Sequence, residues 1–245
     1  MMRSIAVYSV KGGVGKTTIA TNLAWCSACL SQRRTLLWDM DPQAGSSFLL
    51  RIGSDPRSRA HSIFARTIKP QLLIGHTAYE GLDLLPADQS LRALDSLLVA
   101  LRRRKRLSKI ATSLAPDYDR LIFDCPPVMN EISNQIIRAA DLIIVPLSPS
   151  PLARRALDEI RDDLARNHKG HAPVLPVFSM VDRRRKLHLE TCASEPDWPV
   201  IPMASEIEQV AVRRAPLCSF ALNSNAARTF IALWAGIERK LTAMG

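Results

Sequence analysis

The stretch Val10-Lys11-Gly12-Gly13-Val14-Gly15-Lys16-Thr17-Thr18 decides the fold. It follows a short apolar run over 4–10, which predicts a buried strand, and precedes a helical pattern over 16–30. Strand, glycine-rich loop and helix form the context of a phosphate-binding loop, in which backbone N–H groups and the positive end of the helix dipole face an anion. In such a loop, Lys16 reaches the β- and γ-phosphates of a nucleotide and the Thr17 hydroxyl binds Mg²⁺.

The loop departs from the common pattern at its first position. The pattern G-x-x-x-x-G-K-[ST] has glycine where this chain has Val10, and a second lysine, Lys11, comes next. The segment 11–17 resembles the deviant Walker A motif of the ParA/MinD family of ATPases. That resemblance implies that Lys11 reaches across a dimer interface to the nucleotide of the other subunit. It also implies a set of ATP-binding residues: Lys11, Gly12, Gly13, Val14, Gly15, Lys16, Thr17 and Thr18, with Pro202 and Met203 flanking the base.

Two acidic segments follow predicted strands. The strand over 35–38 ends in Asp39-Met40-Asp41-Pro42-Gln43, and carboxylates at the carboxyl end of a parallel strand point to the ligand crevice. The segment resembles the D-x-D-P-Q motif of the same family, which implies that Asp41 positions or activates the attacking water. Asp39 is expected to support the loop or the water shell of the metal. The strand over 119–124 ends in Asp124-Cys125-Pro126-Pro127 and resembles Walker B, which implies that Asp124 holds Mg²⁺ through a water.

The remaining patterns predict one doubly wound α/β domain over 1–245. Further apolar strands are expected at 81–87, 142–147, 174–181 and 199–202, alternating with helices. Five to seven such strands predict a mostly parallel sheet with helices on both faces, as in P-loop NTPases. The sequence contains no linker rich in glycine or serine, no repeat and no apolar run of ~18 residues, so no membrane span is expected.

The chain is strongly basic, with 33 Lys and Arg against 23 Asp and Glu, a net charge of +10 and a pI of about 9.8. This balance favours an acidic polymer or surface as partner, although solubility alone could also explain it. By resemblance the partner is DNA, bound without sequence specificity. The candidate contacts are Arg213 and Arg214, near the end of a helix over 206–215, and Arg184 and Arg185, after the 174–181 strand. The run 102–106 is either a solvated face or a nucleic-acid contact.

Two smaller patterns bear on alternatives. The final helix, over 226–244, carries Phe230, Leu233, Trp234, Ile237, Leu241 and Met244 on one face, which favours packing in the core over membrane attachment. Cys26 and Cys29 form a C-x-x-C within the first helix, and with no second pair at zinc spacing we expect them to pack in the core. A cluster protein like the nitrogenase iron protein is disfavoured, because Cys125 directly follows Asp124.

The resemblance implies an ATPase that closes as a homodimer on ATP, binds DNA in that state and releases it after a slow, partner-stimulated hydrolysis. It would partition or position plasmids, chromosomes or large protein complexes, with a stimulating adaptor or centromere-binding protein, in a nucleoid-associated cytoplasmic setting. Two alternatives within the fold stay open: a MinD-like positioning ATPase at a membrane, and a ParA-like regulator of cellulose synthesis machinery.

Overall fold

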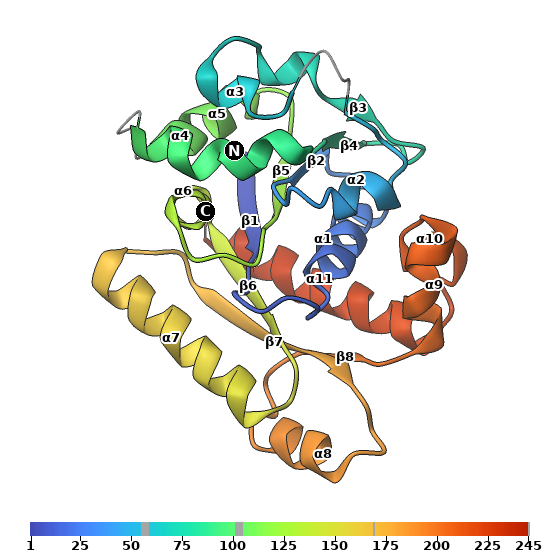
Figure 1. The fold of residues 1–245 in the computed structure, drawn as a ribbon. Helices are drawn as coiled ribbons and strands as arrows, with labels where there is room; N and C mark the ends of the chain where they lie inside the picture. Colours follow the sequence, from blue (N-terminus) through green and yellow to red (C-terminus); the bar gives the residue numbers. More distant parts are fainter. Residues whose placement is uncertain (55–58, 101–104, 169, 245) are drawn as a thin grey trace.

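A computed structural model describes residues 1–54, 59–100, 105–168 and 170–244. Its centre is one sheet with the strand order β3-β4-β2-β5-β1-β6-β7-β8, in which β3 alone is antiparallel to its neighbour among the described strands (Figure 1). The mostly parallel sheet predicted from the sequence is confirmed. The strands are β1 (Arg3–Val7), β2 (Thr35–Asp39), β3 (Gly75–His76), β4 (Leu82–Leu85), β5 (Arg120–Asp124), β6 (Leu142–Leu147), β7 (Val174–Val181) and β8 (Val200–Pro202).

The central strands set the position of the two acidic segments. Every residue of β2 and β5 is buried, as expected for apolar strands covered on both faces of a parallel sheet. In the register of these strands, Asp39 lies beside Asp124, and Asp124 lies beside Val7, the last residue of β1. Both carboxylates therefore come together at the same edge of the sheet as the loop that follows β1.

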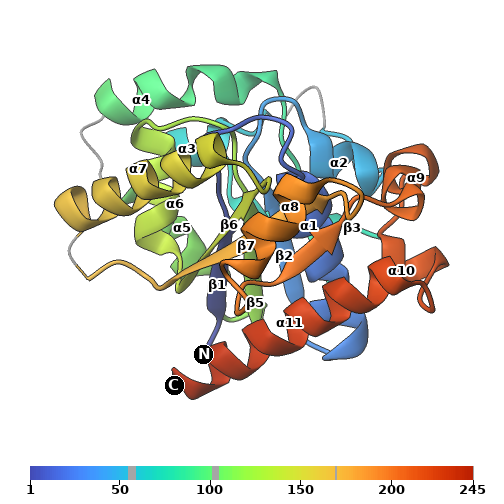
Figure 2. The same ribbon diagram turned by 90° about the horizontal axis from the view of Figure 1, so that it is seen from below.

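Helices cover both faces of the sheet (Figures 1 and 2). One face packs against α3 to α7, and the other against α1, α2, α9, α10 and α11. The helices are α1 (Lys16–Trp25), α2 (Gly45–Leu49), α3 (Ser62–Ala65), α4 (Leu94–Ala100), α5 (Arg106–Leu114), α6 (Glu131–Ala139), α7 (Pro151–Asn167), α8 (Lys186–Ala193), α9 (Ser205–Arg213), α10 (Leu217–Phe220) and α11 (Asn225–Ala243), with a π turn η1 (Cys26–Leu30) and 3₁₀ turns η2 (Pro70–Leu72) and η3 (Gln89–Ala93).

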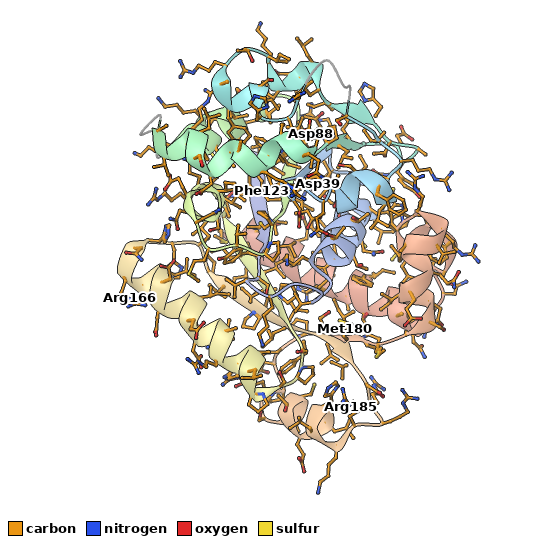
Figure 3. All side chains as sticks on the ribbon, in the orientation of Figure 1. Asp39, Asp88, Phe123, Arg166, Met180 and Arg185 are labelled. Atoms are coloured by element: carbon orange, nitrogen blue, oxygen red, sulfur yellow. The ribbon has the colours of Figure 1, made fainter. Side chains whose placement is uncertain are left out.

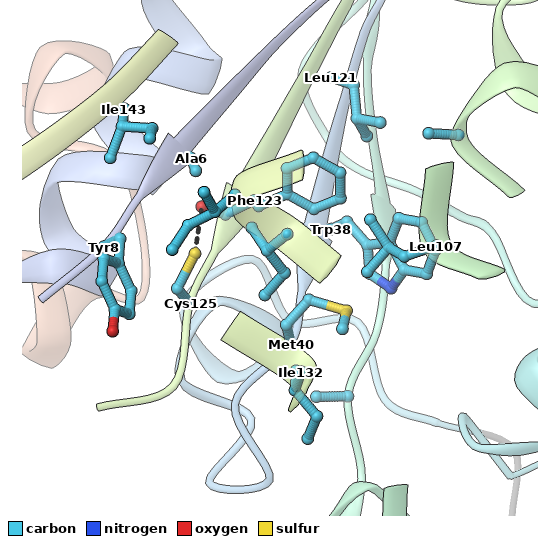
Figure 4. Close-up of a cluster of buried hydrophobic side chains, with 14 of the residues drawn as sticks. Ala6, Tyr8, Trp38, Met40, Leu107, Leu121, Phe123, Cys125, Ile132 and Ile143 are labelled. Carbon is cyan, nitrogen blue, oxygen red and sulfur yellow. Dashed lines mark hydrogen bonds between the residues drawn. The ribbon is translucent and has the colours of Figure 1, made fainter. Parts of the chain in front are cut away.

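The larger hydrophobic cluster fills the space between the sheet and α3 to α7. Trp38 and Phe123 lie side by side on adjacent strands, and their rings pack at a tilt of 36° with centroids 5.7 Å apart (Figure 4). Cys125 belongs to the same cluster, and its thiol lies 3.7 Å from the carbonyl oxygen of Phe123. Cys125 is therefore a core residue.

The last helix packs as predicted. Five of its six expected apolar residues are buried, whereas Met244 follows the end of α11 and is 40% exposed. The guanidinium of buried Arg120 donates to both carboxylate oxygens of Glu238, at 3.1 and 2.6 Å, and so ties α11 to the start of β5. No helix among the described residues combines the length and apolar character needed to cross a bilayer.

The first strand and the first helix end earlier than predicted. β1 stops at Val7, because Ser9 and Val10 already belong to the loop, and α1 gives way to the π turn at Cys26. A π turn has more residues per turn than an α-helix, so side chains three apart no longer share a face. Cys26 is buried as expected, but Cys29 is exposed, so the expectation that both cysteines pack in the core is wrong for Cys29.

Of the basic run over 102–106, only Lys105 and Arg106 belong to the described residues. Arg106 is buried and donates to the carbonyl oxygens of Ile63 and Phe64, at 2.6 and 3.1 Å, which joins α5 to α3. It therefore does not belong to a solvated face. The 51–80 segment, least readable from sequence, contributes α3, η2 and the two-residue edge strand β3; Arg57 lies outside the described residues.

Candidate functional site

The loop after β1 forms one wall of a pocket of about 560 Å³. Gly13 and Gly15 have φ of +70° and +83°, a conformation in which glycine avoids the strain of a side chain. A Cβ on Gly12 or Gly13 would meet no atom within 4 Å, so the loop backbone is open to a ligand. Lys16, Thr17 and Thr18 also line the pocket, while Val14 is buried.

Lys16 is held inside this loop. Its side chain is 7% exposed, and its ammonium donates a 2.9 Å hydrogen bond to the carbonyl oxygen of Lys11. Burial lowers the pKa of Lys16, and the nearby negative charge of Asp124 opposes this shift. The amine therefore lies at the start of α1, within a pocket suited to an anion.

Lys11 is placed differently. Its main chain accepts the bond from Lys16, and its N–H donates to the Ser9 hydroxyl at 3.3 Å. The residue is partly exposed, and it is not among the residues that line the pocket, whereas its neighbour Gly12 is. The second lysine thus supports its own pocket through the backbone and leaves its side chain outside it.

Asp124 is fully buried at the carboxyl end of β5. Its Oδ2 accepts a 2.7 Å hydrogen bond from the hydroxyl of Ser46, and its Oδ1 has no protein partner. Burial raises the pKa of Asp124 to about 7, repulsion from Asp39 adds to this, and the hydroxyls of Ser46 and Thr17 oppose it. A buried carboxylate oxygen that lacks a donor is poised to accept one from a ligand.

Asp39 is engaged with the polypeptide instead. Its Oδ2 accepts from the N–H and the hydroxyl of Ser47, at 2.9 and 2.8 Å, and its Oδ1 accepts from the N–H of Asp41 at 3.2 Å. Burial raises its pKa to about 6, which these hydrogen bonds counteract. Figure 3 labels Asp39 in the upper half of the view, next to the helix that Figure 1 labels α2. These contacts match the first of its two expected roles, the support of the loop.

The donor set fits a magnesium ion. Oxygen ligands suit Mg²⁺, which usually keeps several waters and takes only one or two protein groups. Thr17, which lines the pocket, provides a hydroxyl, and the free Oδ1 of Asp124 provides a carboxylate oxygen. Asp124 is fully buried and is not itself a lining residue, so it would act through a water of the metal. Asp41 also lines the pocket, and its Oδ1 accepts from the N–H of Gln43 at 2.9 Å, which fixes the turn that presents its carboxylate.

The far end of the pocket is mostly apolar. Met180, Ile201, Pro202 and Ile207 line it together with Glu208. Of the two residues expected to flank the base, Pro202 lines the pocket, whereas Met203 is not a lining residue and is exposed. Met180 was not anticipated from the sequence; it has a φ of +58° at the end of β7, where Figure 3 shows it.

The predicted DNA contacts fall in two separate places. Arg213 and Arg214 end α9, where their guanidiniums lie over the rings of Phe220 and Phe48, at 4.8 and 4.4 Å from the ring centroids. Arg184 and Arg185 precede α8, which lies at the bottom of Figure 1, whereas α9 and α10 lie at its right-hand side; Figure 3 labels Arg185 near α8. Arg184 donates two 2.9 Å hydrogen bonds to Asp182, which lowers the pKa of that carboxyl to about 2.

Sequence reasoning missed the short helix α2, which follows the D-x-D-P-Q segment. A Cβ on Gly45 would lie 3.1 Å from the Thr17 hydroxyl oxygen, so glycine permits a close approach here. Ser46 and Ser47 hold Asp124 and Asp39 respectively. Two adjacent serines between two acidic motifs were the available signal, but only the fold shows which carboxylate each one contacts.

Known proteins with similar sequences support the same interpretation. A family model described as "AAA domain" matches residues 2–174. The chain is 33% identical to the chromosome partitioning protein ParA of Myxococcus xanthus, over 76% of this chain and 67% of that protein. It is 29% identical to the sporulation initiation inhibitor protein Soj of Bacillus subtilis, over 78% of this chain and 77% of that protein.

A solved structure has a similar fold and contains a nucleotide and magnesium. Cobyrinic acid a,c-diamide synthase from Mycobacterium smegmatis, with bound ATP analogue and magnesium, is 25% identical and superposes with a TM-score of 0.83 over 100% of this chain and 97% of that one. This neighbour is consistent with the ATP and Mg²⁺ expected from the motifs. With the matched domain covering most of the sequence and the ParA relatives spanning most of its length, the chain belongs to the ParA/MinD family of P-loop ATPases.

Proposed function

We propose that this protein hydrolyses ATP to ADP and phosphate and uses the cycle to form and dissolve a homodimer that binds DNA without sequence specificity. The proposal extends to one domain over 1–245, because the described residues share a single sheet. The cargo would be a plasmid, a chromosome or a large protein complex, and an adaptor or centromere-binding protein would stimulate hydrolysis. The protein would then reside with the nucleoid in the cytoplasm.

Within one subunit, the pocket supplies the groups that phosphoryl transfer needs. Lys16 and the loop N–H groups would hold the phosphates, and Thr17 and Asp124 would hold Mg²⁺, which neutralises charge on the phosphate oxygens when bound. Asp41 lines the same pocket and would orient the attacking water. Catalysis by such a set depends on positioning and electrostatic stabilisation, with no covalent intermediate on the protein.

The position of Lys11 is the main support for the proposed ATP-dependent dimer. Lys11 is not a lining residue of its own pocket, although Gly12, Gly13, Gly15 and Lys16 are. A lysine at the rim of one pocket can serve the phosphates of a facing subunit, and two such lysines repel each other unless the phosphate charge lies between them. Closure would therefore depend on the γ-phosphate, and hydrolysis would loosen the dimer.

DNA binding follows from charge and avidity. The chain carries a net charge of +10, and two subunits held together double the cations that face the phosphate backbone. Two linked sites bind far more tightly than two free ones, so ATP would convert weak contact into stable retention. Arg213 and Arg214 are the preferred contacts, because Asp182 already offsets the charge of Arg184, whereas the guanidiniums of Arg213 and Arg214 lie over uncharged rings.

One side-by-side measurement tests this function against the membrane alternative. Plasmid retention and liposome sedimentation are followed with a slowly hydrolysed ATP analogue, with ADP and without nucleotide. We expect retention on DNA with the analogue only, and no lipid recruitment, since the apolar face of α11 is buried in the core. Analogue-dependent sedimentation with liposomes and none on DNA would instead assign a MinD-like role.

A further inference from the structure

The short helix α2 touches both the metal end of the pocket and the end of α9. Only five residues long, it is flanked by Ala44 and Arg51, with φ of +53° and +59°. Left-handed backbone at a non-glycine residue is uncommon and is maintained only where surrounding contacts hold it. Figures 1 and 2 both place α2 between α1 and α9. The contacts at its two ends explain what holds it there.

At the pocket end, α2 is bound to the nucleotide motifs through buried hydroxyls. The Ser46 hydroxyl donates to Oδ2 of Asp124 at 2.7 Å and lies 3.3 Å from the Thr21 hydroxyl of α1. Ser47 is bonded to Asp39 and accepts from the N–H of Ala87 at 3.1 Å. Any change in how Asp124 is held thus acts directly on the first turn of α2.

At the other end, α2 is bound to Arg213 and Arg214, which we call the arginine corner. Nε of Arg214 donates to the carbonyl oxygen of Phe48 at 2.8 Å while its guanidinium covers the Phe48 ring. Arg51, just beyond α2, donates to the carbonyl oxygen of Arg213 at 3.0 Å. Arg214 itself has a φ of +51°, so this corner too depends on its contacts.

We propose that α2 couples the occupied state of the pocket to the arginine corner within one subunit, with Ser46 and Phe48 as the two contact points. The inference rests on the proposed function in one respect, that nucleotide and Mg²⁺ bind the pocket. Ser46 and Phe48 are only two residues apart on this short helix, so a shift of Ser46 displaces the Phe48 carbonyl to which Arg214 is bonded. The arginines are then reoriented by the subunit's own ligand, in addition to any effect of dimer formation.

Hydrogen exchange of the full-length protein tests the coupling. Amide exchange over 46–51 and 211–220 is compared with and without the magnesium complex of a slowly hydrolysed ATP analogue. We expect both segments to be protected in the native protein. Ser46→Ala removes a contact of Asp124 and is therefore compared at an analogue concentration that gives native protection over 12–18; at that occupancy it should lose protection at 211–220. Ser27→Ala is the matched control, because Ser27 is an equally buried serine that bonds Thr35 away from the pocket; it should behave as native protein.

Two further measurements separate the possible outcomes. Lys11→Ala, expected to stay monomeric, should keep the protection at 211–220; its loss there would assign the protection to subunit contact and overturn the coupling. Coupling between two sites is reciprocal. Arg214→Ala should therefore reduce the gain in analogue affinity that Mg²⁺ causes by about 5-fold or more, whereas Arg155→Ala on α7 should leave this gain unchanged. If the native protein binds the analogue but exchange at 211–220 does not change, this inference alone is overturned. If the native protein does not bind the analogue at all, the proposed function is overturned as well.

Discussion

The ammonium group of Lys16 donates a 2.9 Å hydrogen bond to the main-chain carbonyl of Lys11, which ties together the two lysines of the phosphate-binding loop. The bond divides their roles. Lys16 is buried within the pocket, while Lys11 closes the loop through its backbone and keeps its side chain off the pocket wall. The first two predictions follow from this division.

Lys16→Ala should weaken ATP binding by about 10- to 100-fold, the equivalent of the ~1.5–3 kcal/mol that a charged hydrogen bond contributes. Titration calorimetry with an ATP analogue measures the effect. Lys186→Ala is the control, since Lys186 lies exposed on α8 beside Glu190. If Lys16→Ala bound the ATP analogue with native affinity, the assignment of this loop as the phosphate-binding site would be wrong.

Lys11→Ala should bind the ATP analogue with nearly native affinity but remain a monomer. The substitution leaves the carbonyl that accepts from Lys16 in place, and only the side chain outside the pocket is lost. Light scattering during gel filtration, with and without the analogue, gives the mass. A Lys11→Ala dimer that forms with native dependence on the analogue contradicts the role of Lys11 across the interface.

The sequence predicted what depends on local pattern. The phosphate-binding loop, both acidic strand ends and the buried face of α11 are each written in a short run of residues, and each lies where expected. Contacts between distant residues could not be predicted: nothing near Ser46 indicates that it bonds Asp124, and Arg106 stands in a basic run yet is buried. The exposure of Cys29 depends on a π turn, which a periodic pattern does not reveal.

Asp41→Ala should slow ATP turnover by about 100-fold or more, the usual contribution of a group that positions a reacting water. Nucleotide binding should persist, so the ATP-bound dimer should accumulate. Phosphate release measures the turnover and gel filtration measures the dimer. Gln43→Ala serves as the control for the turn, because it keeps the backbone N–H that Asp41 accepts from. Undiminished turnover in Asp41→Ala would show that another residue positions the attacking water.

Asp124→Asn should stabilise the nucleotide-free, metal-free protein at pH 8. The native pKa of about 7 lies above that of the unfolded chain, so the folded state binds the extra proton and loses stability as pH rises from about 4 to 7. The asparagine side chain is uncharged at both pH 8 and pH 5, and its amide oxygen can still accept the hydrogen bond from Ser46. The gain in melting temperature should therefore shrink as the pH is lowered to 5, and a gain that is equal at both pH values contradicts the shift.

Arg213→Glu with Arg214→Glu should reduce retention on plasmid DNA at saturating ATP analogue, where the weaker analogue affinity expected for Arg214 variants no longer limits occupancy. Each phosphate contact contributes about 0.9 to the slope of log affinity against log salt concentration, so the loss of two contacts should lower that slope by about 2 per subunit. Arg184→Glu with Arg185→Glu is the matched comparison, because it makes an equal change of charge just before α8, a different helix from α9 (Figure 1). If that pair lowers the slope and the Arg213 and Arg214 pair does not, the DNA surface lies at α8, and the arginine corner no longer serves as the DNA contact. If both pairs lower the slope equally, both surfaces contact DNA, because the salt slope falls only when an arginine that touches a phosphate is lost.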